Sequence, residues 1–310
     1  MRRKILHNIW GKLVQWIKLV RIHNLLIVLI GLLISVRASM IPHLEDLRYN
    51  NYAELIEIVL IIAPPALLAA SGGYIRNDYF DLESDRISKP WRPLARGVIK
   101  PELADRVALA MYILAPLYSL LVIGWITAIF TLLNVILIDL YNSNLKRKGL
   151  AGNIVVSLAT ANVFIYGALS YSEKYIGRIE ISIYALIPFL FAFLLTLTRE
   201  IIKGIEDLEG DTRISAGTLA LIYGFKKASA IALLIGVIIG LILVIPLYLI
   251  FSYQYLVLAI LTVALAIYSS YYILGSVNTS EAINRARRAR SLTKISLFIG
   301  TIAFLTWLFT

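Results

Sequence analysis

The stretch AELIEIVLIIAPPALLAASGGYIRNDYFDLESD, residues 53–85, decides the fold. Its first part, 53–73, is mostly apolar, and about 20 such residues let an α-helix cross a bilayer. Its last part carries Asn77, Asp81 and Asp85 at intervals of four residues. Because residues four apart share one face of a helix, the stretch predicts a membrane-spanning helix that is closed by an acidic motif.

The composition of the whole chain excludes an ordinary soluble protein. Of its 310 residues, 59% are hydrophobic and 16% are charged, and the mean hydropathy is +0.80. Soluble domains usually carry about 25% charged residues. The chain has no cysteine, which excludes disulfides, thiolate metal sites and cysteine nucleophiles, and its three histidines are too scattered for a metal site. Any bound metal is therefore expected to have oxygen ligands.

Nine apolar runs of this kind follow one another, which predicts an all-α polytopic membrane protein with nine transmembrane helices. The run from Val107 to Tyr141 is too long for one span, so we divide it near Gly124 and Trp125. The predicted spans are residues 24–40, 53–73, 106–124, 126–142, 151–171, 179–198, 228–251, 255–275 and 291–309.

The distribution of cations predicts the orientation of these spans. Of the 30 Lys and Arg residues, 26 lie in the N-terminal segment and in the loops that follow even-numbered spans. Because cytoplasmic loops carry the excess of basic residues, we expect a cell-membrane protein whose N-terminus and whose two acidic motifs face the cytoplasm. Residues 1–22 are predicted to form a basic amphipathic segment on the membrane surface. Nucleic acid is not an expected partner of a chain so embedded in lipid.

A second acidic cluster repeats the spacing of the first. Asp207 and Asp211 follow the sixth predicted span, four residues apart. Like charges at this spacing destabilise a helix unless something neutralises them. Oxygen ligands without His or Cys point to Mg²⁺, which commonly shares its coordination with substrate phosphates. The two clusters together predict a magnesium site that binds a diphosphate.

A diphosphate site also needs cations, because four Asp carboxylates alone would repel the anion. The sequence supplies Lys and Arg beside both clusters, and Arg can fork onto phosphate oxygens while Lys acts as a point charge. The candidate diphosphate-binding residues are Lys89, Arg92, Arg96, Lys146, Arg199 and Lys203.

The two clusters also indicate an internal repeat, since they follow the second and the sixth predicted spans. Membrane proteins built from repeats commonly place their site at the repeat interface. We therefore expect two four-helix halves and one extra helix, arranged around a central cavity.

In three places the chain resembles the UbiA superfamily of intramembrane prenyltransferases. The first signature of this family, N-D-x-x-D-x-x-x-D, matches residues 77–85, and the second, R-E-x-x-K-x-x-x-D-x-E-G-D, matches residues 199–211. A weaker match joins residues 141–146, Y-N-S-N-L-K, to the Tyr-Ser and Leu-Lys elements that end the fourth helix in the family. The resemblance covers nearly the whole chain, and the nine helices of the family agree with the predicted spans.

The resemblance implies an Mg²⁺-dependent transferase that moves a polyprenyl group from its diphosphate to a membrane-associated acceptor. Segments 77–106 and 199–227 would then be the cytoplasmic catalytic loops of a single domain, 1–310. In such a site the metal and the basic residues stabilise charge on the leaving diphosphate, and dry surroundings protect an allylic carbocation from water. The expected metal ligands are Asn77, Asp81, Asp85, Asp207 and Asp211.

Further side chains near the cytoplasmic half of the spans could stabilise the carbocation through aromatic faces or amide oxygens. The candidates are Tyr141, Asn144, Asn162 and Tyr166. Asp139 lies one turn inside the fourth predicted span, where an ionisable residue is a functional candidate. It could accept the proton of the acceptor, orient Lys146 or an arginine, or form a structural ion pair.

The acceptor that the resemblance favours is geranylgeranylglyceryl phosphate, with a geranylgeranyl donor, because R-E-I-I-K and D-x-E-G-D are similar to archaeal ether-lipid members of the family. Arg92, Arg96 and Lys146 could hold its phosphate. The alternative acceptor is 4-hydroxybenzoate or a related quinone precursor. A CDP-alcohol phosphotransferase would need a D-G-x-x-A-R stretch, which the chain lacks. A cation transporter fits less well, because flanking Arg and Lys suit an anionic substrate.

Overall fold

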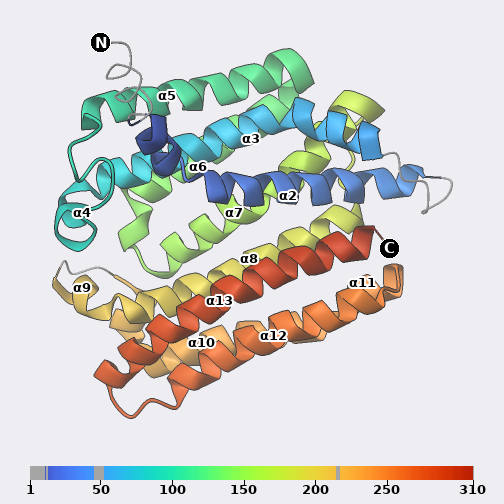
Figure 1. Cartoon of the computed structure of the whole chain (residues 1–310). Helices are drawn as coiled ribbons and strands as arrows, with labels where there is room; N and C mark the ends of the chain where they lie inside the picture. Colours follow the sequence, from blue (N-terminus) through green and yellow to red (C-terminus); the bar gives the residue numbers. More distant parts are fainter. Residues whose placement is uncertain (1–10, 12, 45–51, 214–216, 310) are drawn as a thin grey trace. The chain divides into compact units, whose positions relative to one another are not determined.

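The computed structural model describes residues 11, 13–44, 52–213 and 217–309. Within these ranges the regular elements are all helices, which confirms the prediction of an all-α protein. The first elements in chain order are α2 (Ile22–Met40), η1 (Ile41–His43), α3 (Tyr52–Phe80), α4 (Leu82–Ser88), α5 (Pro101–Tyr118), η2 (Ser119–Ile123), α6 (Trp125–Ser143), η3 (Leu145–Arg147) and α7 (Leu150–Tyr171) (Figure 1). They are followed by η4 (Ser172–Ile176), α8 (Ile183–Glu206), α9 (Leu208–Arg213), α10 (Leu219–Ile242), α11 (Val244–Leu249), α12 (Tyr253–Leu274) and α13 (Thr279–Leu308).

Nine helical segments of the described chain are long and apolar enough to cross a membrane, in agreement with the nine predicted spans. Large apolar side chains are exposed along them, among them Leu60 (65%), Ile113 (66%) and Leu241 (71%). Soluble proteins rarely expose large contiguous apolar surface to water. The exposure of these side chains therefore agrees with a multi-pass membrane protein.

Several helices extend beyond their predicted spans: α8 continues past residue 198 to Glu206, and α5 begins at Pro101 and not at residue 106. Helix α3 continues from residue 73 to Phe80, and α13 begins at Thr279 and not at residue 291. These extensions include charged residues, and a helix satisfies its backbone hydrogen bonds internally whatever its side chains are. A hydropathy run therefore marks the lipid-embedded part of a helix and not its ends. Much of the two segments predicted as loops is likewise helical, in α4, α9 and the ends of the adjoining spans.

The basic N-terminal segment is described from residue 13 on and at residue 11, while residues 1–10 and 12 lie outside the described residues. Residues 13–19 are helical. Leu19 is fully buried, whereas Leu13 is 46% exposed. Exposed apolar side chains on a basic helix are typical of a helix that lies on a membrane surface.

The predicted break at Gly124 is confirmed, because this residue separates η2 from α6. Two adjacent side chains of η4 stabilise the resulting hairpin. The carboxylate of Glu173 accepts a hydrogen bond from the backbone N–H of Thr127, 2.7 Å away. Lys174 donates to the carbonyl oxygen of Val122 at 2.5 Å. A helix end leaves such backbone groups without partners. Here Glu173 binds donors at the start of α6, and Lys174 binds an acceptor at the end of η2.

The helices divide into two units. The first comprises the residues up to Leu33, Tyr52–Ser143 and Leu169–Glu180. In it α3, α5 and α6 pack against one another around a core that includes Tyr112 and Val135. This unit holds most of the first four predicted spans.

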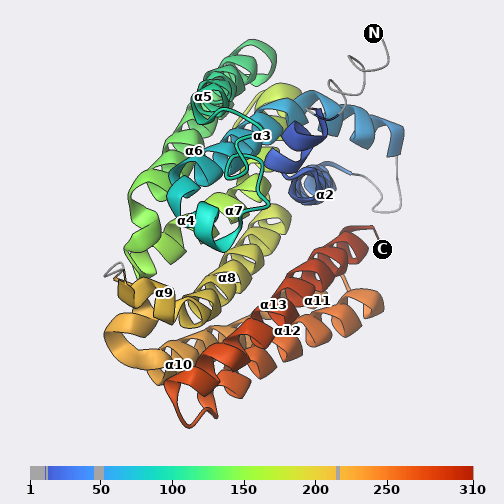
Figure 2. The same cartoon turned by 60° about the vertical axis from the view of Figure 1, so that its left-hand side comes forward.

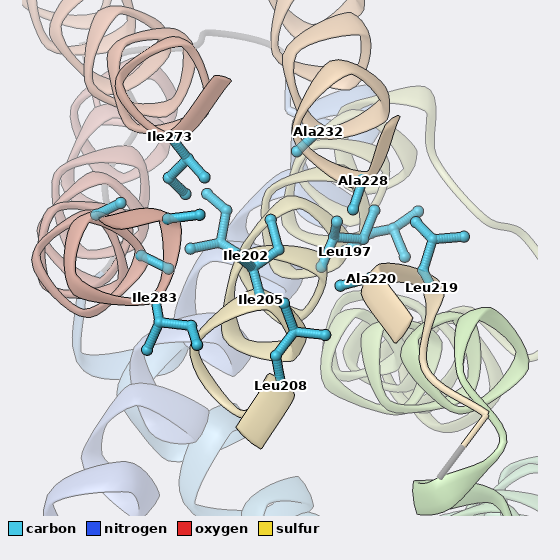
Figure 3. Packing of buried hydrophobic residues seen from close by; sticks show 14 residues of the cluster. Leu197, Ile202, Ile205, Leu208, Leu219, Ala220, Ala228, Ala232, Ile273 and Ile283 are labelled. Carbon is cyan, nitrogen blue, oxygen red and sulfur yellow. The ribbon is translucent and has the colours of Figure 1, made fainter. Parts of the chain in front are cut away.

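The second unit comprises Ile34–Asn51, Asn144–Ala168 and Ile181–Thr310. Helix α8 packs against α10 and α13, and α12 packs against the same two helices (Figure 2). The core between them contains Leu197, Ile202, Ile205, Leu208, Leu219, Ala220, Ala228, Ala232, Ile273 and Ile283 (Figure 3). The two units agree with a division after the fourth span, although α2 and α7 each belong to both, and the central cavity stays a prediction.

Candidate active site

The first acidic motif is helical, as its spacing predicts. The backbone N–H of Asp81 donates to the carbonyl of Asn77 at 3.0 Å, and the N–H of Asp85 donates to the carbonyl of Asp81 at 2.8 Å. The i to i−4 hydrogen bonds therefore continue across the junction between α3 and α4. Asn77, Asp81 and Asp85 consequently lie on three successive turns of one helical face.

A buried carboxylate beside this face, that of Asp78, binds two arginines. Its side chain is 5% exposed, and its Oδ1 lies 2.6 Å from Nη2 of Arg21 and 2.9 Å from Nη1 of Arg92. Arg92 also forms an ion pair with Asp85, and Nζ of Lys89 lies 3.6 Å from the other oxygen of Asp85. Arg92, which the sequence assigns to phosphate, thus holds two carboxylates of the motif together in this structure.

Arg21 reaches the motif from the junction between the N-terminal helical residues and α2. Among the described residues it is the one non-glycine with a positive φ, 55°. Its guanidinium lies over the ring of Tyr74, 5.2 Å from the centroid, and 3.5 Å from Oδ1 of Asn77. Left-handed backbone is costly for a side chain with a Cβ. The contacts with Tyr74 and Asp78 offset that cost and aim the cation at the motif.

The amide of Asn77 is held by a second asparagine. Nδ2 of Asn77 donates to Oδ1 of Asn142 at 3.2 Å, and Nδ2 of Asn142 donates to the carbonyl of Gly73 at 3.0 Å. Asn142 is buried near the end of α6, directly after Tyr141. This chain of hydrogen bonds fixes the orientation of the Asn77 amide relative to α3 and α6.

An arginine next to Asn77 joins three helices of the first unit. Nη1 of Arg76 lies 2.5 Å from Asp105 of α5, and Nε of Arg76 lies 2.5 Å from Asp139 of α6. The guanidinium also lies 5.0 Å from the ring centroid of Phe80. Of the roles that the sequence leaves open for Asp139, the contact with an arginine is the one present in this structure.

The second motif begins where α8 ends. The backbone N–H of Asp207 donates to the carbonyl of Lys203 at 3.0 Å, and the Asp207 residue is exposed. Asp211 belongs to α9, and its side chain lies outside the described residues. Glu200, 7% exposed, pairs with Arg199 and, at 3.4 Å, with Lys203. The two predicted phosphate-binding cations of α8 therefore also neutralise a buried carboxylate.

Glu206, directly before Asp207, is tied to the last helix. Its Oε2 accepts a hydrogen bond from Nη1 of Arg290 at 2.9 Å, and its Oε1 lies 3.9 Å from Nε of Arg287. The end of α8 is thus attached to the first turns of α13 within the second unit.

The remaining candidates are distributed over both units. The first unit holds Lys89, Arg92, Arg96, Asp139 and Tyr141 together with Asn77, Asp81 and Asp85. The second unit holds Asn144, Lys146, Asn162, Tyr166, Arg199, Lys203, Asp207 and Asp211. Arg96 is exposed, whereas Tyr166 is 5% exposed on α7.

Sequence reasoning did not select Asp78, Arg21, Asp105 or Asn142 as members of the site. Asp78 offered a signal, because an ionisable residue at the end of an apolar span needs a partner. The identity of that partner depends on turns that no spacing rule determines.

The first motif has donors that suit a hard cation. In the described part of the chain no group of three or more acidic or histidine side chains is arranged as a metal site. However, Oδ1 of Asp85 is buried and accepts no hydrogen bond from the described residues, since Nζ of Lys89, at 3.6 Å, lies beyond hydrogen-bond distance. A buried acceptor without a donor is costly, and a cation at this oxygen would remove that cost. The oxygen-only chemistry of the motif fits Mg²⁺.

Residues 24–302 match the UbiA prenyltransferase family. The digeranylgeranylglyceryl phosphate synthase of Hyperthermus butylicus is 35% identical over 302 residues, which cover 94% of this chain and 96% of the relative. The similarity thus extends over nearly the full length of both proteins.

Solved structures agree with this relationship. One described as digeranylgeranylglyceryl phosphate synthase in membranes has a TM-score of 0.74 and 27% identity, and the alignment covers 96% of this chain and 99% of that one. A UbiA homolog from Archaeoglobus fulgidus, solved with DMAPP and Mg²⁺, has a TM-score of 0.58 and 15% identity, with 92% and 99% covered. At that identity the second likeness concerns the fold alone.

Proposed function

Because this chain belongs to the UbiA prenyltransferase family, we propose that it transfers a geranylgeranyl group from its diphosphate to geranylgeranylglyceryl phosphate. The bond between the allylic carbon and the diphosphate oxygen breaks, an ether bond to the acceptor hydroxyl forms, and the hydroxyl proton and diphosphate leave. The observation that carries the proposal is the full-length similarity to the synthase of Hyperthermus butylicus.

We propose that the metal of this reaction is Mg²⁺. Support comes from the oxygen-only donors, from the buried Oδ1 of Asp85, which accepts no hydrogen bond from the described residues, and from the Mg²⁺ bound by the Archaeoglobus fulgidus homolog. Bound Mg²⁺ would supply positive charge to the leaving diphosphate. The proposed metal ligands are Asn77, Asp81, Asp85, Asp207 and Asp211.

The cations around the two motifs are proposed to bind the phosphates. Arg92 already lies beside Asp85, and its planar fork suits two phosphate oxygens. Lys89 lies one helical turn after Asp85, and its Nζ is 3.6 Å from Oδ1 of Asp85. Cations placed before the reaction stabilise the charge that develops on the leaving group without reorganisation. The proposed set is Lys89, Arg92, Arg96, Lys146, Arg199 and Lys203.

Asp139 is proposed to position Arg76, and through it α3, and not to accept a proton. Its carboxylate lies 2.5 Å from Nε of Arg76, so its charge is already engaged. Tyr141, three residues before Asn144, is proposed to lie near the allylic cation, where an aromatic face stabilises positive charge. The apolar spans around these side chains would keep water from the carbocation.

We propose further that the N-terminus and both motifs face the cytoplasm. The support is the distribution of 26 of 30 cations on that side of the predicted spans.

The purified protein with labelled geranylgeranyl diphosphate and Mg²⁺ provides the test, with either geranylgeranylglyceryl phosphate or 4-hydroxybenzoate as acceptor. We expect diphosphate release and an ether product from the lipid acceptor, and neither after EDTA removes the metal. Product from 4-hydroxybenzoate alone would assign an aromatic acceptor instead. Flux of Mg²⁺ into proteoliposomes without consumption of prenyl diphosphate would contradict an enzyme.

A further inference from the structure

A cavity of about 480 Å³ lies between the end of α12 and the start of α13, in the second unit. Its walls include Tyr272 of α12 and Glu281, Asn284, Arg285 and Arg288 of α13. None of these residues belongs to either acidic motif or to the proposed cation set. The cavity is therefore formed by residues other than those proposed for the reaction.

Arg285, one of the two arginines of the cavity, is held in place by contacts with Tyr272 of α12 and Glu281 of α13. Nη1 of Arg285 donates to the carbonyl of Tyr272 at 2.8 Å, and Nη2 lies 2.6 Å from Oε1 of Glu281. The other oxygen of Glu281 accepts a hydrogen bond from the N–H of Val277 at 2.8 Å. Both oxygens of this carboxylate therefore have partners near the connection between α12 and α13, and Arg285 balances its charge.

The second arginine carries the net charge of the cavity. Arg288 is exposed, and in the described part of the chain it forms no ion pair. Its Nη1 lies 3.5 Å from the hydroxyl of Tyr272, at the limit of hydrogen bonding. A guanidinium and a phenol that converge on a cavity beside the exposed carboxamide of Asn284 suit a ligand with several anionic oxygens.

The cavity lies at the end of a helix that is long and apolar enough to span a membrane. Helix α12, 22 residues long, has the length and apolarity of a span, and the cavity lies at its C-terminal end. Tyr268 and Tyr271, which are 53% and 65% exposed, precede that end, and the ring of Tyr268 stacks on Tyr272 with centroids 5.8 Å apart. Exposed tyrosines are enriched where a span meets the headgroups.

We propose that this cavity binds the phosphate headgroup of an anionic membrane lipid, with Arg288 as its main charge partner. Charge complementarity identifies the headgroup, and the position of the cavity at the end of a span identifies a lipid as its source. Basic pockets between transmembrane helices bind headgroups in this way. The proposal does not depend on the prenyl transfer reaction.

Arg287 provides a matched control for Arg288. Both arginines are exposed on the same turn of α13, but Arg287 lies 3.9 Å from Glu206 and does not line the cavity. Replacement of either residue by Ala removes one charge from the same membrane face. A general attraction of anionic lipid to this face would therefore weaken equally in both variants.

Native mass spectrometry of the full chain, titrated with phosphatidylglycerol or phosphatidylcholine, tests the proposal. We expect Arg288→Ala to lower the affinity for phosphatidylglycerol about fivefold, the effect of one basic residue at an anionic surface. Arg287→Ala should leave it unchanged, and phosphatidylcholine should bind weakly to all forms. Equal losses in both variants, or no loss in Arg288→Ala, would overturn the site.

Two further measurements keep the result interpretable. Tyr272→Phe removes the hydroxyl that faces Arg288 and keeps the backbone carbonyl that Arg285 binds, so it tests the cavity even if Arg288→Ala fails to fold. We expect weaker binding of phosphatidylglycerol in this variant also. Competition by inorganic phosphate at the same concentration as the lipid would overturn the assignment to a membrane lipid.

Discussion

Arg76 and Asp139 join α3 to α6 through an ion pair of 2.5 Å, one residue before the first acidic motif begins. The arginine side chain is 11% exposed, and Asp105 of α5 lies on its other side at 2.5 Å. Two carboxylates thus share one buried cation. Loss of either partner leaves Arg76 with the other, which determines what substitutions at this cluster should do.

Asp139→Asn is expected to lower the free energy of unfolding by about 1 kcal/mol, because the pair is partly exposed and Arg76 keeps Asp105. The double variant Asp105→Asn, Asp139→Asn should cost about 3–5 kcal/mol, since a buried charge is then left uncompensated. Denaturation of the purified protein measures both. Glu102→Gln, an exposed site on α5, is the control. Full loss of turnover in a stable Asp139→Asn protein would instead indicate a direct chemical role.

Arg92→Gln is expected to lower turnover and the apparent affinity for Mg²⁺ by about 10- to 100-fold, the usual effect of removing a group that orients metal ligands. Its guanidinium holds Asp78 and Asp85 together, so both carboxylates lose a fixed position. Arg92→Lys should restore part of the activity, because Nη1 alone contacts both carboxylates and a single ammonium nitrogen can replace it.

Arg86→Gln is the matched control for Arg92, because Arg86 is exposed on α4 and carries the same charge. Turnover of both variants is measured over a range of Mg²⁺ concentrations, and only Arg92→Gln should need more Mg²⁺. Similar losses in Arg86→Gln and Arg92→Gln would show that general charge, and not the contact with the carboxylates, matters.

Asp81→Asn and Asp207→Asn are each expected to lower diphosphate release by about 100-fold or more, the scale of losing a group that stabilises developing charge. Glu83→Gln, at an exposed position of α4 that the first signature leaves variable, should retain activity. Size-exclusion profiles and melting temperatures test whether all three variants are folded. Turnover that survives in either Asp variant would contradict its assignment as a metal ligand.

Much of the fold could be predicted because it depends on local patterns. Apolar runs identify all nine spans of the described chain, and the spacing of Asn77, Asp81 and Asp85 identifies their common helical face. The residues at which helices end could not be predicted from hydropathy. Helix α3 continues seven residues past its predicted end at residue 73, through residues whose polar side chains find partners that hydropathy does not register.

The partners of the site residues could not be predicted, because they depend on the course of irregular segments. Arg92 follows α4 in a stretch without regular structure, and its position is determined by turns there. The sequence therefore assigns it to phosphate, whereas it contacts Asp78 and Asp85. Arg21 is 57 residues from Asp78, a separation at which no spacing rule applies.

Gly124→Ala is expected to destabilise the protein by about 1–2 kcal/mol, the range observed for loss of a helix cap. A Cβ at Gly124 would lie 2.1 Å from the carboxyl carbon of Glu173, which would then have to leave the start of α6. Its backbone is extended and suits any residue, so the effect comes from this contact.

Gly204→Ala is the contrasting substitution, since nothing lies within 4 Å of a Cβ there. The residue is within α8, and Ala in a helix is more stable than Gly by about 0.5–1 kcal/mol. Thermal unfolding should therefore shift in opposite directions for the two variants. A loss of stability in Gly204→Ala, or none in Gly124→Ala, would contradict these contacts.

The pairing of Arg21 with Asp78 bears on how the chain enters the membrane. Arg21 leaves the ribosome 57 residues before Asp78, which at about 5–20 residues per second is an interval of roughly 3–11 s. During that interval the guanidinium has no Asp78 to bind and is most stable at the boundary between lipid and water. We expect the first span to stay at that depth until Asp78 emerges, when the ion pair joins the start of α2 to the last turn of α3. A single ion pair would thus link the order of synthesis to the depth of insertion.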